Sequence, residues 1–284
     1  MIARRAIGLV FTLVLLITFS SSAQELYIAN ESQSKLQLLN FNTTPPQLTT
    51  LYNIGAKPDD LILNSLGQLI YSVPALGVVN LYDPFAGTNT TLVSGMSRAR
   101  DLQITPDGQS LLIALYPLGQ IVRFNFATGT TTVLAKKLGN VNGIAYDPYG
   151  NLYAVAKYNT IVQLDPVTGA VLNTLVLEPH HGINGADGLV YDSYTGSLWG
   201  AHAGTTGIGV VQIPVTAAGL GSSSSLYVFN TTGAAPDGIK SDGKGNLYIG
   251  AIFTVLVYNI PTNTITHRVV TKGADGVSLV PGTY

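Results

Sequence analysis

The sequence has no cysteine, little charge and no long basic run. Of its 284 residues, none is Cys and 10% are Asp, Glu, Lys or Arg. Disulfides, thiolate metal ligands and a Cys nucleophile are therefore excluded. With 14 Lys and Arg against 15 Asp and Glu, no surface for a phosphate backbone is expected, and we expect no nucleic-acid partner. Motifs of serine hydrolases, nucleotide-binding loops and zincins are also absent.

The first residues have the pattern of a secretory signal peptide. Arg4 and Arg5 precede an apolar stretch, and small residues end at Ala23, so cleavage is predicted after residue 23. The stretch is shorter than the ~20 residues of a spanning helix, so we expect a secreted protein without a membrane partner. The mature chain, 24–284, then carries 12 basic and 15 acidic residues. Four glycosylation sequons predict a glycoprotein, at Asn30, Asn42, Asn89 and Asn230.

One unit recurs six times along the mature chain. A Leu followed by a large apolar residue returns at intervals of 41 to 49 residues, at Leu26, Leu69, Leu111, Leu152, Leu198 and Leu247. Turn sequences such as Asp147-Pro148-Tyr149-Gly150-Asn151 precede most of these pairs, and short β-rich runs follow them. Because no 3.6-residue periodicity occurs beyond the first segment, four antiparallel strands per unit are predicted. The fold class is therefore all-β, a six-bladed propeller.

The two ends of the mature chain complete each other. Asp275 to Val280 looks like the first strand of a unit, after which the sequence stops, whereas the mature N-terminus begins at a second strand, Glu25-Leu26-Tyr27. We therefore predict that the terminal strands share one blade and close the ring of a single domain. Closure removes the exposed strand edges that favour aggregation.

A polar residue opens each unit, usually before Gly and an aliphatic residue. The six are Asp59, Arg100, Asn142, Asp187, Asp237 and Asp275. Since the first strands of a propeller line its central channel, we expect these side chains to encircle one channel mouth. Four carboxylates and an amide suit a hard cation such as Ca²⁺, or Mg²⁺ or Mn²⁺ in a smaller cage. Alternatively, each Asp-Gly is a structural turn whose carboxylate caps backbone N–H groups.

The pattern resembles a known group of propellers. Asp237-Gly238-Ile239 followed by Asp242 to Tyr248, and the variant Asn142-Gly143-Ile144, are similar to the gluconolactonase and regucalcin group. Pro58-Asp59-Asp60-Leu61 resembles the acidic pair that opens the paraoxonase propellers. This resemblance implies a divalent cation, usually Ca²⁺, bound by Asp59, Asn142 and Asp187 or Asp237 or both. The family usually has Glu where this chain has the shorter Asp59.

The resemblance also implies ester chemistry at the mouth. Lactonases of the group polarise the ester carbonyl with the cation, and a nearby carboxylate or His activates water. Asp237 and His181 are the candidates for that base, since the loop carrying His180 and His181 leads into Asp187. Arg100 is a candidate clamp for a substrate carboxylate or hydroxyl, or else a counter-ion of Asp59 or Asp101. His202 is expected in a loop on the same side.

Three functions follow from the sequence. The first is a secreted metal-dependent hydrolase of lactones or related esters, acting as a monomer on a small-molecule substrate. The second is a non-catalytic extracellular propeller that binds a partner or a glycan. The third is a propeller of the streptogramin-lyase or strictosidine-synthase type, with different chemistry at the same mouth.

Overall fold

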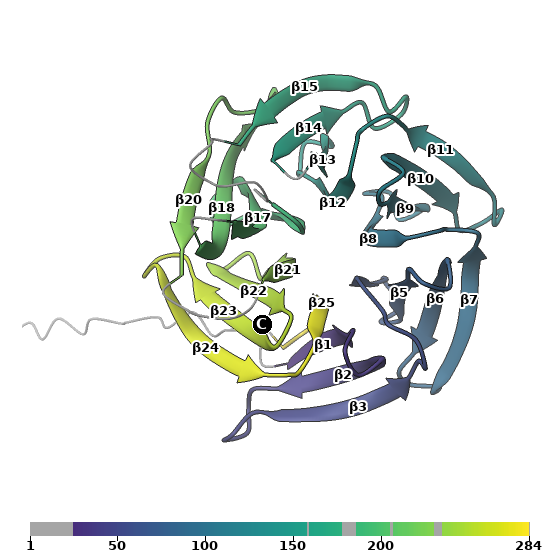
Figure 1. Ribbon diagram of the computed structural model, residues 1–284, viewed down its shortest axis with the longest axis vertical. Helices are drawn as coiled ribbons and strands as arrows, with labels where there is room; N and C mark the ends of the chain where they lie inside the picture. The colour runs from purple at the N-terminus through teal and green to yellow at the C-terminus, as the bar shows by residue number, and fades with distance from the viewer. Residues whose placement is uncertain (1–24, 158, 178–185, 205–206, 230–234, 284) are drawn as a thin grey trace, which may run out of the picture.

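The computed structural model describes residues 25–157, 159–177, 186–204, 207–229 and 235–283, which form six antiparallel sheets arranged as the blades of a propeller. Figure 1 shows the blades around a central channel. Within the described ranges there is no helix. The described residues therefore contain no helix long and apolar enough to span a bilayer. The predicted fold class is confirmed.

Each blade is described from its innermost strand outward. The first four contain these strands: β25 (Ala274–Leu279), β1 (Glu25–Asn30), β2 (Lys35–Asn40) and β3 (Gln47–Asn53); β4 (Leu61–Leu63), β5 (Leu69–Val73), β6 (Val78–Asp83) and β7 (Thr88–Ser94); β8 (Ala99–Ile104), β9 (Ser110–Leu115), β10 (Gln120–Asn125) and β11 (Thr131–Ala135); β12 (Val141–Tyr146), β13 (Leu152–Ala156), β14 (Thr160–Leu164) and β15 (Val171–Val176).

The last two blades follow the same order. The fifth has β16 (Leu189–Asp192), β17 (Ser197–Gly204), β18 (Gly207–Thr216) and β20 (Ser225–Val228), with the short β19 (Gly219–Leu220) also pairing with β18. The sixth has β21 (Pro236–Ser241), β22 (Asn246–Ala251), β23 (Thr254–Asn259) and β24 (Thr264–Val270).

The core lies between neighbouring blades. Second strands such as β9 and β13 are buried along their whole length, because each blade face is covered by the next blade. Their continuous apolar sequences follow from this two-sided burial. Outer strands such as β24 alternate between half-buried and exposed residues, as expected for a sheet with solvent on one side.

Turn residues fix the hairpins that the repeat predicted. In the turn before β13, the Asp147 Oδ1 accepts the N–H groups of Tyr149 and Asn151 at 3.0 and 2.9 Å. Gly150 has a φ of 86°, which a residue with a side chain adopts only at a cost. Asp147 Oδ2 also accepts the hydroxyl of Tyr153 at 2.8 Å, which ties the turn to the strand that follows it.

The chain ends share the first blade, as predicted. Leu26 is paired with Leu279 and Ile28 with Val277 in antiparallel register. The buried amide of Asn30 donates to Gln37 Oε1 at 2.7 Å and to the Thr271 carbonyl at 2.9 Å. The Asn30 side chain therefore helps to hold the ring closed. Because it is buried, it is inaccessible as a glycosylation acceptor in the folded protein.

Candidate functional site

The first strands of neighbouring blades touch where they enter the channel. Gly276 N–H donates to the Asp59 carbonyl and Gly188 N–H to the Asp237 carbonyl, both at 2.9 Å. A Cβ on Gly276 would lie 2.6 Å from that carbonyl oxygen. The Gly of the Asp-Gly motif is therefore required by the close approach of two backbones, and the preceding residue is held at the channel mouth.

Two blades use a carboxylate where the others use Gly. Asp60 Oδ2 accepts the N–H of Leu102 at 3.0 Å, and Asp101 Oδ2 accepts the N–H of Ile144. Each side chain thus bonds the first strand of the next blade, and both residues are buried. Neither is the Asp of an Asp-Gly turn, so their bonds to the neighbouring blade differ from the capping alternative, in which a carboxylate bonds N–H groups at its own strand entry.

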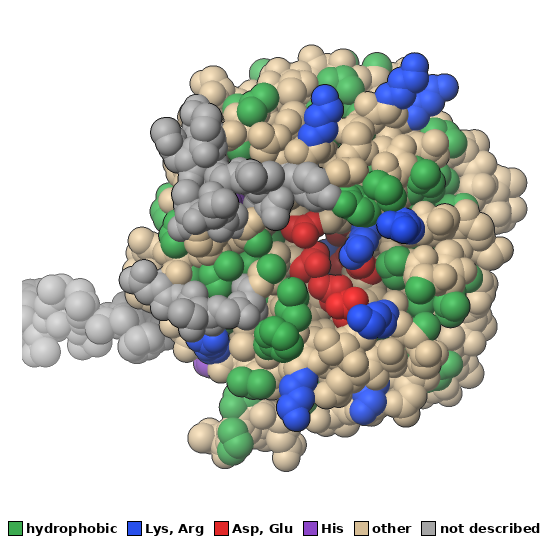
Figure 2. All heavy atoms as spheres, viewed as in Figure 1, with side chains coloured by type: hydrophobic (Ala, Val, Ile, Leu, Met, Phe, Trp, Pro, Cys, Tyr) green, Lys and Arg blue, Asp and Glu red, His purple; other side chains and the backbone are tan. Residues whose placement is uncertain are grey.

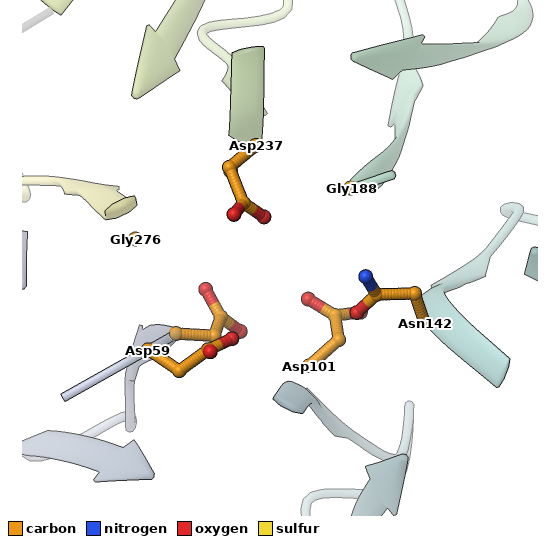
Figure 3. A pocket seen from close by; sticks show the side chains of 8 residues that line it. Asp59, Asp101, Asn142, Gly188, Asp237 and Gly276 are labelled. Atoms are coloured by element: carbon orange, nitrogen blue, oxygen red, sulfur yellow. The ribbon is translucent and has the colours of Figure 1, made fainter. Parts of the chain in front are cut away.

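The six predicted positions converge on one mouth. Figure 3 shows Asp59, Asn142 and Asp237 facing one another from three blades, with Asp101 beside Asn142. Figure 2 shows the same acidic group at the centre of one face of the molecule. Asp187 joins this group through a hydrogen bond that the Asn142 amide donates to it.

Burial and mutual repulsion act on the carboxyl groups of the mouth. Burial raises the pKa of Asp59 and Asp187 well above the usual range, and the charge of Asp237 raises both further. The pKa of Asp275 is raised by burial, by the charges of Asp237 and Asp59, and by a hydrogen bond to Asp237. The ring therefore favours protons or cations.

Arg100 is the counter-ion at the mouth. Its guanidinium pairs with Asp59 Oδ2, and the Cζ lies 5.5 Å from the ring centroid of Tyr116. Burial acts to lower the Arg100 pKa, but the charges of Asp59, Asp237, Asp275 and Asp187 outweigh it and raise the pKa. Of the two sequence-based roles for Arg100, the counter-ion role is the one seen here.

The donor set of the mouth has the chemistry of a hard-cation site. A cavity of about 10 Å³ is lined by the side chains of Asp59, Asp60, Asp101, Asn142 and Asp237, a volume near that of one water or ion. These donors are oxygen ligands, which fits Ca²⁺ or Mg²⁺. As they stand, however, no three acidic or His side chains of the described residues are grouped around one ion position.

Lys240, which was not predicted from the sequence, lies deeper in the channel. Its Nζ is 3.7 Å from Asp60 Oδ1, a buried oxygen that accepts no hydrogen bond. Burial opposes the charge of Lys240, but Asp60 and Asp101 raise its pKa. Burial and the charge of Asp60 raise the pKa of Asp101 well above its usual range. The feature of the sequence that could have identified Lys240 is its place two residues after Gly238, in an inner strand.

Lys240 also borders a second cavity at the other end of the channel. This cavity measures about 310 Å³ and is lined mainly by apolar residues of the first strands, together with Gln103, Ser241 and Ser278. The group of Asp60, Asp101 and Lys240 therefore separates the acidic mouth from a larger and less polar cavity.

Two predictions about histidines have different outcomes. His180 and His181 lie outside the described residues, so the proposed base His181 stays a prediction. His202 is not in a loop as expected; it lies within β17 and is fully buried. The strand extends to Gly204 because β17 and β18 pair up to Gly204 and Gly207, which places His202 opposite Gly209.

The chain is similar to known proteins in its fold. No protein-family model matches it, and no curated protein matches it. Its structure is similar to that of a chain in a nidogen/laminin complex, with a TM-score of 0.73 at 16% identity, covering 90% of this chain and 98% of that one. The likeness is one of fold.

Two enzymes share this fold. A gluconolactonase from Xanthomonas campestris has a TM-score of 0.69 at 14% identity, with 89% of this chain and 88% of that chain covered. Virginiamycin B lyase from Staphylococcus aureus has a TM-score of 0.62 at 14% identity, with 90% and 85% covered. The resemblance to six-bladed propellers is thus confirmed, and the chemistry belongs to the individual sites.

Proposed function

We propose that the protein is a secreted, divalent-metal-dependent hydrolase of lactones or related esters, with its site at the acidic mouth. The observation that carries the proposal is the convergence of Asp59, Asn142 and Asp237 on a cavity of about 10 Å³, beside carboxyl groups whose pKa values are raised. A divalent cation would offset both the burial and the mutual repulsion that raise them. The shared fold of a gluconolactonase supports the substrate class.

Each mouth residue has a proposed role. Asp59, Asn142, Asp187 and Asp237 would hold the cation, most simply Ca²⁺, after Arg100 leaves Asp59 and the Asn142 amide turns its oxygen inward. When bound, the cation would polarise the ester carbonyl. Asp237 or His181 would accept a proton from water, and the released Arg100 guanidinium would bind a carboxylate or hydroxyl of the substrate.

Thermal unfolding with and without Ca²⁺ tests the cation site. A cation present at a hundred times its Kd would raise the midpoint by roughly 5 to 10 °C relative to EDTA. Asp59→Ala and Asn142→Ala should lose this rise while staying folded, whereas Glu25→Gln, an acidic residue outside the ring, should keep it. No rise with Ca²⁺, Mg²⁺ or Mn²⁺ would refute the metal-dependent reading.

Hydrolysis is tested separately, with the same variants and a panel of lactones and esters. We expect turnover that EDTA abolishes and that Arg100→Met reduces mainly through KM. A cation-stabilised protein without turnover of any ester would leave the metal site intact and refute the hydrolase.

A non-catalytic binding propeller is the second candidate. It is favoured by the pairing of Arg100 with Asp59 and of Asn142 with Asp187, which satisfies part of the mouth without a cation. The fold shared with a chain of a nidogen/laminin complex is compatible with it. This candidate predicts that Asp59→Ala and Asn142→Ala leave partner binding unchanged.

A further inference from the structure

The exposed cations of the described turns and loops lie mainly on one face of the protein. We call the side with the acidic mouth the mouth face; it carries the loops between blades and the turns between second and third strands. The described part of these loops holds six exposed cations, whereas its acidic residues are half-buried or buried: Glu31, Asp59, Asp60 and Asp187. The cations are Lys57, Arg98, Lys136, Lys137, Lys157 and Lys272. Figure 2 shows Lys and Arg side chains around the acidic centre of this face.

The opposite side, the far face, carries the remaining turns. Six Asp residues begin or occupy its described turns. Asp147, Asp192 and Asp242 are buried, whereas Asp83, Asp107 and Asp165 are half-buried or exposed. The described cation in those turns is Lys244. Backbone N–H groups account for most of these Asp residues, as where Asp83 accepts from Phe85 and Ala86 at 2.9 Å. Among the basic residues of the mouth face, Lys57 pairs with Glu31 at 3.2 Å.

Exposed apolar side chains on the mouth face lie next to the cations. Lys272 N–H donates to the carbonyl of Phe253, whose side chain is 54% exposed. Arg98 N–H donates to Pro74 in the turn that carries Leu76, which is 62% exposed. In the same way, the loop that carries Lys137 is joined to the turn that carries Leu118, because Leu138 N–H donates to the Gly119 carbonyl. Three blades thus present an apolar tip beside a cation.

The far face pairs its apolar tips with carboxylates instead. Phe85 is 87% exposed and lies two residues from Asp83, and Val167 is 77% exposed and lies two residues from Asp165. Exposed apolar residues therefore do not distinguish the two faces. The sign of the neighbouring charge does.

Backbone conformation also marks the cations of the mouth face. Arg98, Lys137, Lys157 and Lys272 have φ values of 58°, 65°, 53° and 58°, in the left-handed region that favours Gly. Long charged side chains stand at positions where Gly would be less strained, a pattern expected where exposure of the charge has a use.

We infer that the mouth face docks peripherally on an anionic lipid surface. Cations attract the headgroups, and Leu76, Leu118 and Phe253 enter the interface between them. A soluble polyanion would use the cations but not the apolar tips beside them. The described turns of the far face offer one cation, Lys244, so docking has one orientation, with the channel mouth toward the lipid. This inference departs from the sequence-based expectation of no membrane partner, which was drawn from the lack of a segment long enough to span a bilayer; a peripheral contact needs no such segment.

Vesicle sedimentation of the full mature protein tests the inference. Vesicles of phosphatidylcholine with one third phosphatidylserine are compared with phosphatidylcholine alone, at low salt and in EDTA. EDTA makes the result independent of the proposed cation site. We expect binding only to the anionic vesicles, weakened roughly 20-fold by Lys136→Gln with Lys137→Gln, and roughly fivefold by Phe253→Ser.

Matched variants on the far face are the controls. Lys244→Gln and Phe85→Ser remove a charge and an apolar tip there and should leave vesicle binding unchanged, with unaltered thermal midpoints showing that all variants fold. Absence of binding to anionic vesicles, or equal effects of the far-face variants, would overturn the inference. Binding to polygalacturonate with no effect of Phe253→Ser on vesicle binding would replace the lipid surface by a soluble polyanion.

Discussion

At the scale of the residue, the ring depends on glycines where two blades touch backbone to backbone. A Cβ added to Gly276 would lie 2.6 to 2.8 Å from three backbone atoms of the second blade. These atoms belong to Asp59, Asp60 and Leu61. No flexible side chain is among these atoms, so the blades themselves would have to shift. In the Asp-Gly repeat, the Gly is therefore required by packing between blades, and the Asp contributes to the polar ring.

Gly276→Ala should lower the free energy of unfolding by about 2 kcal/mol, because the added methyl group overpacks the contact between blades. The control is Gly55→Ala, at a φ of 79° with no atom within 4 Å, which should cost about 1 kcal/mol for its backbone alone. Urea unfolding measures both. A smaller loss for Gly276→Ala than for Gly55→Ala would contradict this account of the ring.

Some contacts of single residues could be predicted from the sequence, and others could not. The convergence of Asp59, Asn142 and Asp237 was predicted, because the repeat gives equivalent positions and the fold brings equivalent positions together. The inter-blade bonds of Asp60 and Asp101 and the charge of Lys240 were not predicted. They depend on distances across the channel between the second, third, fourth and sixth blades, which no local pattern encodes.

At the scale of the element, β25 is the strand that closes the ring. Five of its six residues are buried, and it pairs with β1 at the opposite end of the chain. Without β25, β1 would have a free edge and the core between the first blade and its neighbours would be open to water. Free edges of this kind favour aggregation.

Deleting residues 274–284 should therefore leave a chain that is largely unfolded or aggregated, whereas deleting 281–284 should change little. Far-UV circular dichroism and size-exclusion chromatography compare the two. Adding a synthetic peptide of residues 274–284 to the shorter chain should restore a cooperative thermal transition. A truncated chain with the thermal midpoint of the full protein would show that β25 is dispensable.

At the scale of the whole molecule, the acidic mouth makes stability depend on pH. The raised pKa values of Asp59, Asp187 and Asp275 mean that the folded protein holds these protons more tightly than the unfolded chain does. Their contribution is fully present below the ordinary Asp pKa of about 4 and is lost as the pH rises through the raised values. In EDTA, this contribution falls from acidic toward neutral pH.

Asp275→Asn should remove part of this loss, because Asn stays neutral and keeps a donor toward Asp237. The thermal midpoint of the variant should exceed that of the wild type by an amount that grows between about pH 4 and pH 8. Asp165→Asn should destabilise over the same range, since bonds to the N–H groups of Thr168 and Val167 lower the Asp165 pKa. A pH-independent difference for Asp275→Asn would contradict the proposed repulsion.

The sequence by itself determined the fold class, the number of blades, the shared terminal blade and the polar ring. These follow from spacing and from turn chemistry, both of which are local and repeat along the chain. Only the tertiary structure decided that Arg100 pairs with Asp59, that His202 is buried, that Lys240 lies beside Asp60, and that the exposed cations gather on the mouth face. These depend on which loops the ring brings together, and therefore on contacts between residues far apart in the sequence.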